Sequence, residues 1–140
     1  MIEDWNDSEY CLVAFKRAGY ALGFVENQTH EICLEAVKQN GYNLEHVKEQ
    51  TPEICLEAIK QDGLALEHVK EQTSEMCLEA IKENGFALKW VKNQTPLIIH
   101  YLKKYHILLY ASFKTKNRIT ISENEMKKFY NENPHLLLTL

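Results

Sequence analysis

The sequence predicts an all-α fold, a solenoid-like stack of 22-residue helical hairpins closed by a C-terminal helical cap. The first observation behind this prediction is a repeat with a constant period along the chain. It is marked by the cysteines Cys11, Cys33, Cys55 and Cys77 and by the glycines Gly19, Gly41, Gly63 and Gly85. A fixed period of this size is typical of architectures in which each repeat is one supersecondary unit. The second observation is that helix start and stop signals recur inside every unit.

The repeats divide the chain into two parts. Residues 1–95 hold four units, at 7–28, 29–50, 51–72 and 73–94, and residues 96–140 hold the capping helices and an apolar tail. In the third unit Thr51 is a good N-cap, Pro52 suits the first helical position and Glu53 places negative charge in the first turn. The glycine is expected to end this first helix in a left-handed conformation. A second helix of roughly eight or nine residues should follow, too short to persist without packing.

The first helix of each unit carries a wide apolar side. In the third unit an arc of roughly 200° is apolar. Its members are Ile54, Cys55, Leu56, Ala58 and Ile59. An arc this wide predicts burial against a neighbour on both sides, as in the middle of a stack.

After Thr95 the pattern decays. Thr95 and Pro96 start a fifth helix, and residues 97–113 are expected to continue it as one longer helix that covers the last repeat. Residues 114–118 form a polar, basic break, and Ser122 with Glu125 predicts a capping box that opens a helix to about Asn131. The apolar tail after Pro134 either folds back onto the stack or docks on another molecule, and folding back is favoured.

The evenly spaced cysteines suggest zinc or disulfides, but the spacing fits neither. Equivalent residues of stacked helices should lie about 8–10 Å apart, whereas zinc needs its sulfur ligands within roughly 4 Å of each other. A disulfide needs α-carbons closer than about 7 Å. We therefore expect each cysteine to be a small buried hydrophobic residue and expect no metal site.

Composition and charge exclude several classes of protein. The sequence has no run of 18 or more apolar residues, so no segment of it is expected to span a membrane. The start, MIEDWNDSEY, lacks the basic and apolar regions of a secretory signal, which predicts a cytoplasmic, intracellular location. Residues 1–95 hold 9 Lys/Arg against 17 Asp/Glu, and residues 96–140 hold 7 against 3. Neither part is charged densely enough to predict nucleic-acid binding.

No motif for catalysis is present. The sequence has no glycine-rich phosphate loop, no GxSxG turn, no HExxH pair and no CxxC pair. The carboxylates Glu35, Glu57 and Glu79 repeat because the unit repeats, whereas a general acid–base pair should break the repeat symmetry. We therefore expect no enzyme activity and no cofactor.

The phrase EICLEAVKQNGYNLEHVKEQT, residues 31–51, resembles a short repeat domain of unknown function. The resemblance covers residues 7–95, and the first unit departs from it with Val13 where later units have glutamate. This repeat domain is associated with proteins of large DNA viruses and of bacteria that live in eukaryotic hosts. It implies a helical repeat that engages other macromolecules, and it carries no catalytic residue to this chain.

One column of the repeat is a candidate partner-binding site. It holds the rings of Phe24, His46, His68 and Trp90, the amides of Gln28, Gln50, Gln72 and Gln94 four residues later, and the nearby Lys48, Lys70 and Lys92. Residues at i and i+4 share a helix side, and large flat side chains are enriched at binding hot spots. The alternative interpretation is that the rings cover the joints between repeats while the glutamines cap neighbouring helix ends.

Two functions are consistent with the sequence. The first is a non-catalytic, monomeric module that binds another protein, as a viral or bacterial factor acting on host or defence proteins, within the cytoplasm or a host cell. The second is a structural protein that forms homo-oligomers through its C-terminal helices.

Overall fold

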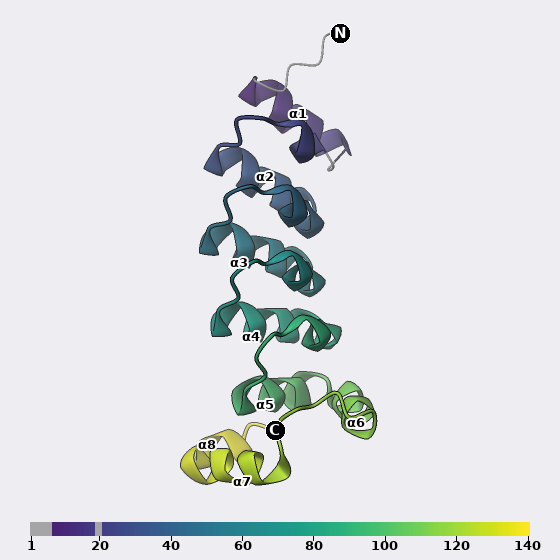
Figure 1. Cartoon of the computed structure of the whole chain (residues 1–140), viewed down its shortest axis with the longest axis vertical. Coiled ribbons are helices and arrows are strands. Elements are labelled where there is room, and N and C mark those ends of the chain that lie inside the picture. The colour runs from purple at the N-terminus through teal and green to yellow at the C-terminus, as the bar shows by residue number, and fades with distance from the viewer. Residues whose placement is uncertain (1–6, 19–20) are drawn as a thin grey trace.

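The computed structural model describes residues 7–18 and 21–140, and every regular element in this part of the chain is helical. Five α-helices stack in sequence order: α1 (Ser8–Ala18), α2 (His30–Gln39), α3 (Pro52–Gln61), α4 (Ser74–Glu83) and α5 (Pro96–Tyr105). Figure 1 shows them as the successive rungs of an elongated molecule. The predicted all-α repeat stack is therefore confirmed.

A threonine starts the first helix of each unit from the second onward. The hydroxyls of Thr29, Thr51, Thr73 and Thr95 accept hydrogen bonds from the backbone N–H groups three residues later, at 3.2–3.3 Å. Pro52 and Pro96 occupy the first turn, where a missing N–H is harmless. These N-terminal signals act as the sequence predicts.

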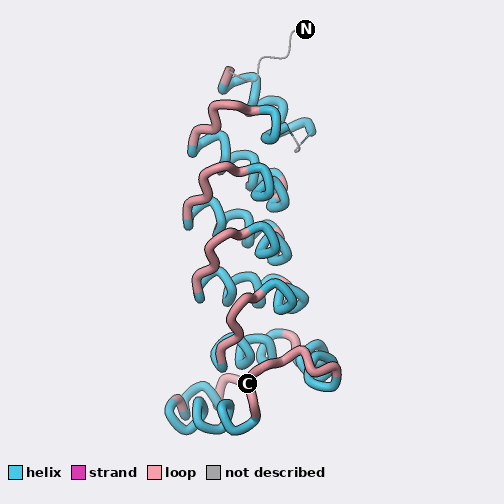
Figure 2. The backbone as a smooth tube through the Cα atoms, in the orientation of Figure 1, coloured by secondary structure: helices cyan, strands magenta, loops and turns pink. Residues whose placement is uncertain are grey.

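The second element of each unit differs from the prediction, because it is a 3-10 helix rather than an α-helix. These elements are η1 (Ala21–Phe24), η2 (Gly41–His46), η3 (Gly63–His68) and η4 (Gly85–Trp90). Side chains at i and i+3 eclipse in a 3-10 helix. In η2 this spacing directs Leu44 and the following Val47 into the core together, where both are buried. On one side of the stack the 3-10 helices pack against one another in order (Figure 2).

The turn between the two helices of a unit is made by one extended residue. In the third unit the N–H of Asp62 donates to the carbonyl oxygen of Ala58 and ends α3, while its carboxylate accepts from the N–H of Leu64 and starts η3. Asp62 has φ −152° and ψ 117°. Asn40 and Asn84 do the same in the second and fourth units.

Because that residue makes the turn, the prediction of left-handed glycines is wrong. Gly41, Gly63 and Gly85 have no φ in the left-handed range. Glycine is needed there for close approach, since a Cβ on Gly41 or Gly63 would lie 2.5 Å from the carbonyl oxygen of Ala58 or Ala80 in the next unit. The fourth repeat glycine, Gly19, lies outside the described residues.

The predicted long helix after Thr95 is also wrong, because it is broken at His106. Helix α5 ends at Tyr105 and α6 (Ile107–Thr115) follows, with His106 at φ −139° and ψ 58°. The imidazole Nε2 of His106 lies 2.7 Å from the carbonyl oxygen of Ile81 at the end of α4. His106 stands one repeat period after Asn84, so the break falls where the other units turn.

The last two helices close the C-terminal end. The predicted capping box is confirmed: Ser122 and Glu125 exchange hydrogen bonds at the start of α7 (Glu123–Glu132). After α8 (Pro134–Leu137) the chain turns back, and the hydroxyl of Thr139 lies 3.3 Å from Nε2 of His100 in α5. Leu138 nevertheless stays 90% exposed.

No helix in the described part of the chain is long and apolar enough to cross a membrane.

Candidate interaction surface

The glutamine column joins each unit to the next. The side-chain amide of Gln50 donates to the carbonyl oxygen of His68 at 2.8 Å, and its Oε1 accepts from the N–H of Lys70 at 3.0 Å. Gln28 makes the same pair of bonds to His46 and Lys48, and Gln72 makes it to Trp90 and Lys92. Both ends of each amide are therefore engaged inside the molecule, at 18 and 20 residues further along the chain.

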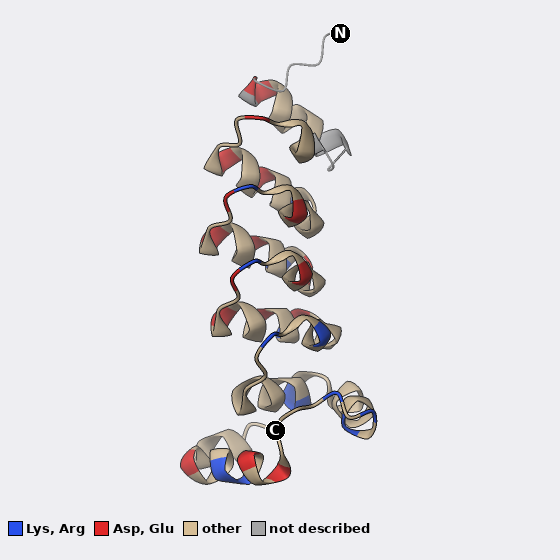
Figure 3. Cartoon of the chain, viewed as in Figure 1, with Lys and Arg blue, Asp and Glu red and all other residues tan. Residues whose placement is uncertain are grey.

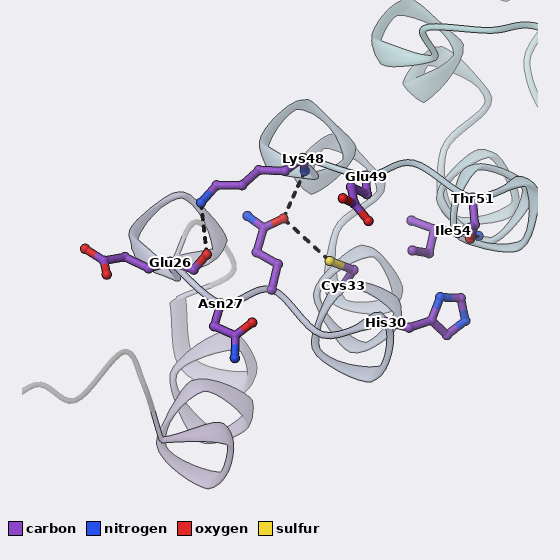
Figure 4. Close-up of a pocket in the computed structure, with 9 residues that line it drawn as sticks. Glu26, Asn27, His30, Cys33, Lys48, Glu49, Thr51 and Ile54 are labelled. Atoms are coloured by element: carbon purple, nitrogen blue, oxygen red, sulfur yellow. Dashed lines mark hydrogen bonds between the residues drawn. The ribbon is translucent and has the colours of Figure 1, made fainter.

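The cysteines belong to the same joints. The thiols of Cys33, Cys55 and Cys77 lie 3.6–3.7 Å from Oε1 of the glutamine five residues earlier, at donor distance for sulfur. Figure 4 shows this arrangement in the hollow around Cys33 and Lys48. The three thiols are buried, as predicted, and burial raises the pKa of each above its usual value. They stay protonated and pack as small apolar groups.

The lysine column supports the same joints from outside. The ammonium group of Lys48 donates to the backbone carbonyl oxygen of Glu26. In the same way, the ammonium group of Lys70 donates to the backbone carbonyl oxygen of Lys48, and that of Lys92 to the backbone carbonyl oxygen of Lys70. Each lysine thus reaches the equivalent position of the preceding unit.

Gln94 shows that the C-terminal part begins as a fifth, longer unit. Its amide donates to the carbonyl oxygen of Arg118, and its Oε1 accepts from the N–H of Thr120. These partners lie 24 and 26 residues ahead instead of 18 and 20, so six extra residues are accommodated within this unit. Helix α6 replaces the 3-10 helix there.

Replacing Gln72 by leucine should destabilise the protein by about 2 kcal/mol, because the carbonyl oxygen of Trp90 and the N–H of Lys92 both lose their partner. Thermal and urea unfolding measure the change. Gln61→Leu is the matched control, since Gln61 is exposed and bonds to Glu57 within its own helix, and it should stay within about 0.5 kcal/mol of wild type. Equal losses in the two variants would contradict a joining role for Gln72.

The rings of the predicted site lie at the ends of the 3-10 helices. Phe24 is 59% exposed and His46 is exposed, while His68 and Trp90 are half-buried. The ammonium group of Lys89 lies 4.4 Å from the centre of the Trp90 ring. His68 meets the ring of Tyr42 from the preceding unit edge-on, with centroids 5.6 Å apart. The structure thus connects this column to a second one.

The second column was not singled out in the sequence. We call it the apolar column: Tyr42, Leu64 and Phe86, each one residue after a repeat glycine, and Leu108, which stands one period after Phe86 and follows Ile107. The first three occupy the first turn of η2, η3 and η4, and Leu108 occupies the first turn of α6. Phe86 is 56% exposed and Leu108 is 84% exposed. The sequence signal was the recurrence of a large apolar residue every 22 residues, next to a glycine in three of the four cases.

A hollow separates the last two members of the apolar column. It has a volume of about 420 Å³ and lies between Phe86 and Leu108, with Glu83, Tyr105 and Ile107 also on its wall. Phe86 packs edge-on against the buried Phe113 of α6, with ring centroids 6.1 Å apart. Phe86 therefore fixes one wall of the hollow to the core, while the wall at Leu108 is exposed to solvent.

No three His, Cys, Asp or Glu side chains of the described residues cluster closely enough to hold a metal ion.

One titratable group is buried in the C-terminal part. His100 is 1% exposed, and its Nδ1 lies 3.0 Å from the hydroxyl of Tyr130. The hydroxyl of Thr139 donates to the carbonyl oxygen of Leu136, so it accepts from Nε2–H, and Nδ1 accepts from Tyr130. Burial, with Lys104 and Lys103 nearby, holds the pKa of His100 below its usual value.

This environment predicts a loss of stability in acid. The neutral imidazole is favoured in the folded chain, so the unfolded chain takes up the proton first as pH falls through about 6.5. The stabilisation is complete above that pH and declines below it. The melting temperature of wild type should fall more between about pH 7.5 and pH 5 than that of His100→Gln. Equal falls would contradict the assignment, and His135→Gln, at an exposed position, serves as the control.

Comparison with known proteins bears on the repeat alone. A family model described as a domain of unknown function, DUF4116, matches residues 29–73 and again residues 51–95. The two matches begin at residues 29 and 51, which are equivalent positions of successive units. Residues 29–95 therefore carry a repeat of unknown function. No curated protein and no solved structure gives a significant match.

Proposed function

We propose that the chain is a non-catalytic module that binds another protein through the exposed side of its 3-10 helices. We further propose that it acts in the cytoplasm, as a viral or bacterial factor on host or defence proteins. The observation that carries the proposal is the apolar column: Tyr42, Phe86 and Leu108 stay exposed at equivalent positions of the second, fourth and fifth units, and Leu64 of the third unit is half-buried between them. Exposed apolar residues that adjoin one another are typical of interaction surfaces.

The engaged polar side chains favour the same conclusion. The glutamines and lysines of the predicted site make hydrogen bonds between units, so they hold together the units that carry the apolar column. The half-buried ring of His68 meets Tyr42 of the column edge-on. A rigid stack that presents large side chains at regular intervals can recognise an extended partner without ordering loops first.

The test compares proteins captured from a host-cell lysate by wild type and by the double variant Tyr42→Ser/Phe86→Ser. We expect a set of partners whose capture falls at least tenfold in the variant, while circular dichroism shows the same helix content. Leu138→Ser is the matched control, because Leu138 is an exposed apolar residue outside the column. The proposal is overturned if no captured protein depends on the column.

A second candidate function is self-assembly through the C-terminal helices. It is favoured by the exposed tail, in which Leu137, Leu138 and Leu140 all face solvent. Light scattering of the purified protein separates the candidates. A dimer or larger species that persists on dilution, and that Leu138→Ser dissociates, would favour self-assembly, whereas a monomer favours the binding module.

A further inference from the structure

We propose that the apolar column binds one amphipathic α-helix of a partner protein, laid along the stack, with basic residues over the second and third units. This inference rests on the proposed binding function and specifies its partner class. It follows from the spacing, the exposure and the charge of the column.

The spacing of the column suits a helix. Stacked helices are separated by about 8–10 Å, and seven residues of an α-helix, nearly two turns, advance about 10.5 Å. A helix that runs along the stack can therefore present one side chain to each unit at every seventh position. Four members of the column correspond to about 21 residues of such a helix.

The exposed side chains give this helix places to dock. Tyr42 is 38% exposed and Phe86 is 56% exposed, and both rings are held in place by edge-on contacts with His68 and Phe113. The hollow between Phe86 and Leu108 has room for one large apolar side chain of the partner. Ring anchors that are already ordered lose little conformational entropy on binding.

The charge beside the column selects a basic partner. Because residues at i and i+3 of a 3-10 helix eclipse, Glu45 lies on the same side as Tyr42, and Glu67 on the same side as Leu64. Asp62 and Glu67 are close enough to Tyr42 to raise the pKa of its hydroxyl, after the effect of burial. No carboxylate of this group has an ion pair with a lysine of the described chain.

The charge changes sign along the column, which gives the helix a direction. Lys89 takes the place of Glu45 and Glu67 in η4, and the ammonium group of Lys104 lies 5.4 Å from the centre of the Tyr105 ring beside the hollow. Glu83 contributes a carboxylate to the wall of the hollow at this C-terminal end of the column. Figure 3 shows acidic residues on the upper rungs and a greater share of basic residues from η4 onward. The basic part of the partner helix should therefore lie over η2 and η3, and its apolar part over Phe86 and Leu108.

The test uses two synthetic helical peptides that have leucine at every seventh position. One carries lysines beside the leucines in one half, and the other carries glutamates at the same places. Fluorescence anisotropy measures their binding to the full chain. We expect the lysine peptide to bind at least tenfold more tightly than the glutamate peptide, and Glu45→Lys/Glu67→Lys to reverse that preference.

Two variants test the column itself. Phe86→Ser and, independently, Tyr42→Ser should each weaken binding of the lysine peptide at least tenfold, with the melting temperature measured alongside, and Leu138→Ser should not. Failure of the lysine peptide to bind, equal binding of both peptides, or unchanged binding by both column variants would overturn the proposal. So would a dimer that Phe86→Ser dissociates, because the occupant would then be a second copy.

The two proposals fail in distinguishable ways. If lysate partners depend on the column but the lysine peptide is not preferred, the binding function stands and the helix is rejected. If neither depends on the column, both are rejected.

Discussion

Replacing Gly63 by alanine should destabilise the protein by about 3 kcal/mol, the upper part of the usual range for overpacking a core. The added Cβ would lie 2.5 Å from the carbonyl oxygen of Ala80, which is backbone and cannot rotate away. It would also lie 3.1 Å from the backbone nitrogen of Asn84. Units three and four must therefore move apart, and urea unfolding of the purified variants measures the cost.

Gly23 provides the control within the same protein. A Cβ on Gly23 would meet its nearest neighbour, the His46 ring, at 3.5 Å, which is an ordinary contact. Gly23→Ala should be neutral or stabilise by up to about 1 kcal/mol, because alanine restricts the unfolded chain. Gly63→Asn should be no better than Gly63→Ala, since asparagine relieves strain at left-handed positions but also adds a Cβ. A well-tolerated asparagine would contradict the close-approach explanation.

Ending the chain at Thr95 should abolish cooperative folding of the C-terminal units. Helix α5 packs on α4, and residues such as Ala80 and Ile81 are fully buried in that core. Without α5 and α6, the apolar side of α4 is exposed, and the carbonyl oxygen of Ile81 loses His106. The fragment should bind a hydrophobic dye or aggregate, and its thermal transition should broaden.

A chain ending at Asn133 is the matched control for this truncation. It lacks α8 and the tail but keeps α5 packed on α4, and α6 and α7 packed on α5. This shorter deletion should retain a cooperative transition with a lower melting temperature, because His100 loses Thr139. A fragment 1–95 that is soluble and unfolds cooperatively would show that residues 96–140 are a separate attachment.

The sequence was sufficient for the parts of the fold that depend on local signals. The repeat period, the threonine caps and the capping box at Ser122 are all local, and each was found where predicted. The 3-10 helices were missed because apolar residues three apart, such as Leu66 and Val69, fit an α-helix equally well in so short a segment. The break at His106 was missed because it lacks the asparagine or aspartate of the other units.

The candidate site was harder to predict because its contacts join residues far apart in sequence. A glutamine that recurs four residues after a ring suggests a shared surface, yet its hydrogen bonds run to the backbone 18 and 20 residues ahead. The apolar column was missed for a related reason. The column recurs every 22 residues, but recurrence does not show which side of the stack a residue faces, so only the structure shows that Tyr42, Phe86 and Leu108 are exposed.

The forward direction of the glutamine bonds has a consequence for how such a chain can evolve. The glutamine of each unit bonds to the backbone of its successor, so an in-frame duplication of one whole unit would keep the partners of these glutamine bonds in place. Deletion of one whole internal unit would likewise preserve the glutamine hydrogen bonds between the remaining units. The final glutamine is different, because Gln94 depends on Arg118 and Thr120 in a segment of another length. Whole units can therefore be added or removed without breaking this hydrogen-bond pattern, whereas the segment from Gln94 to Thr120 must keep its own length.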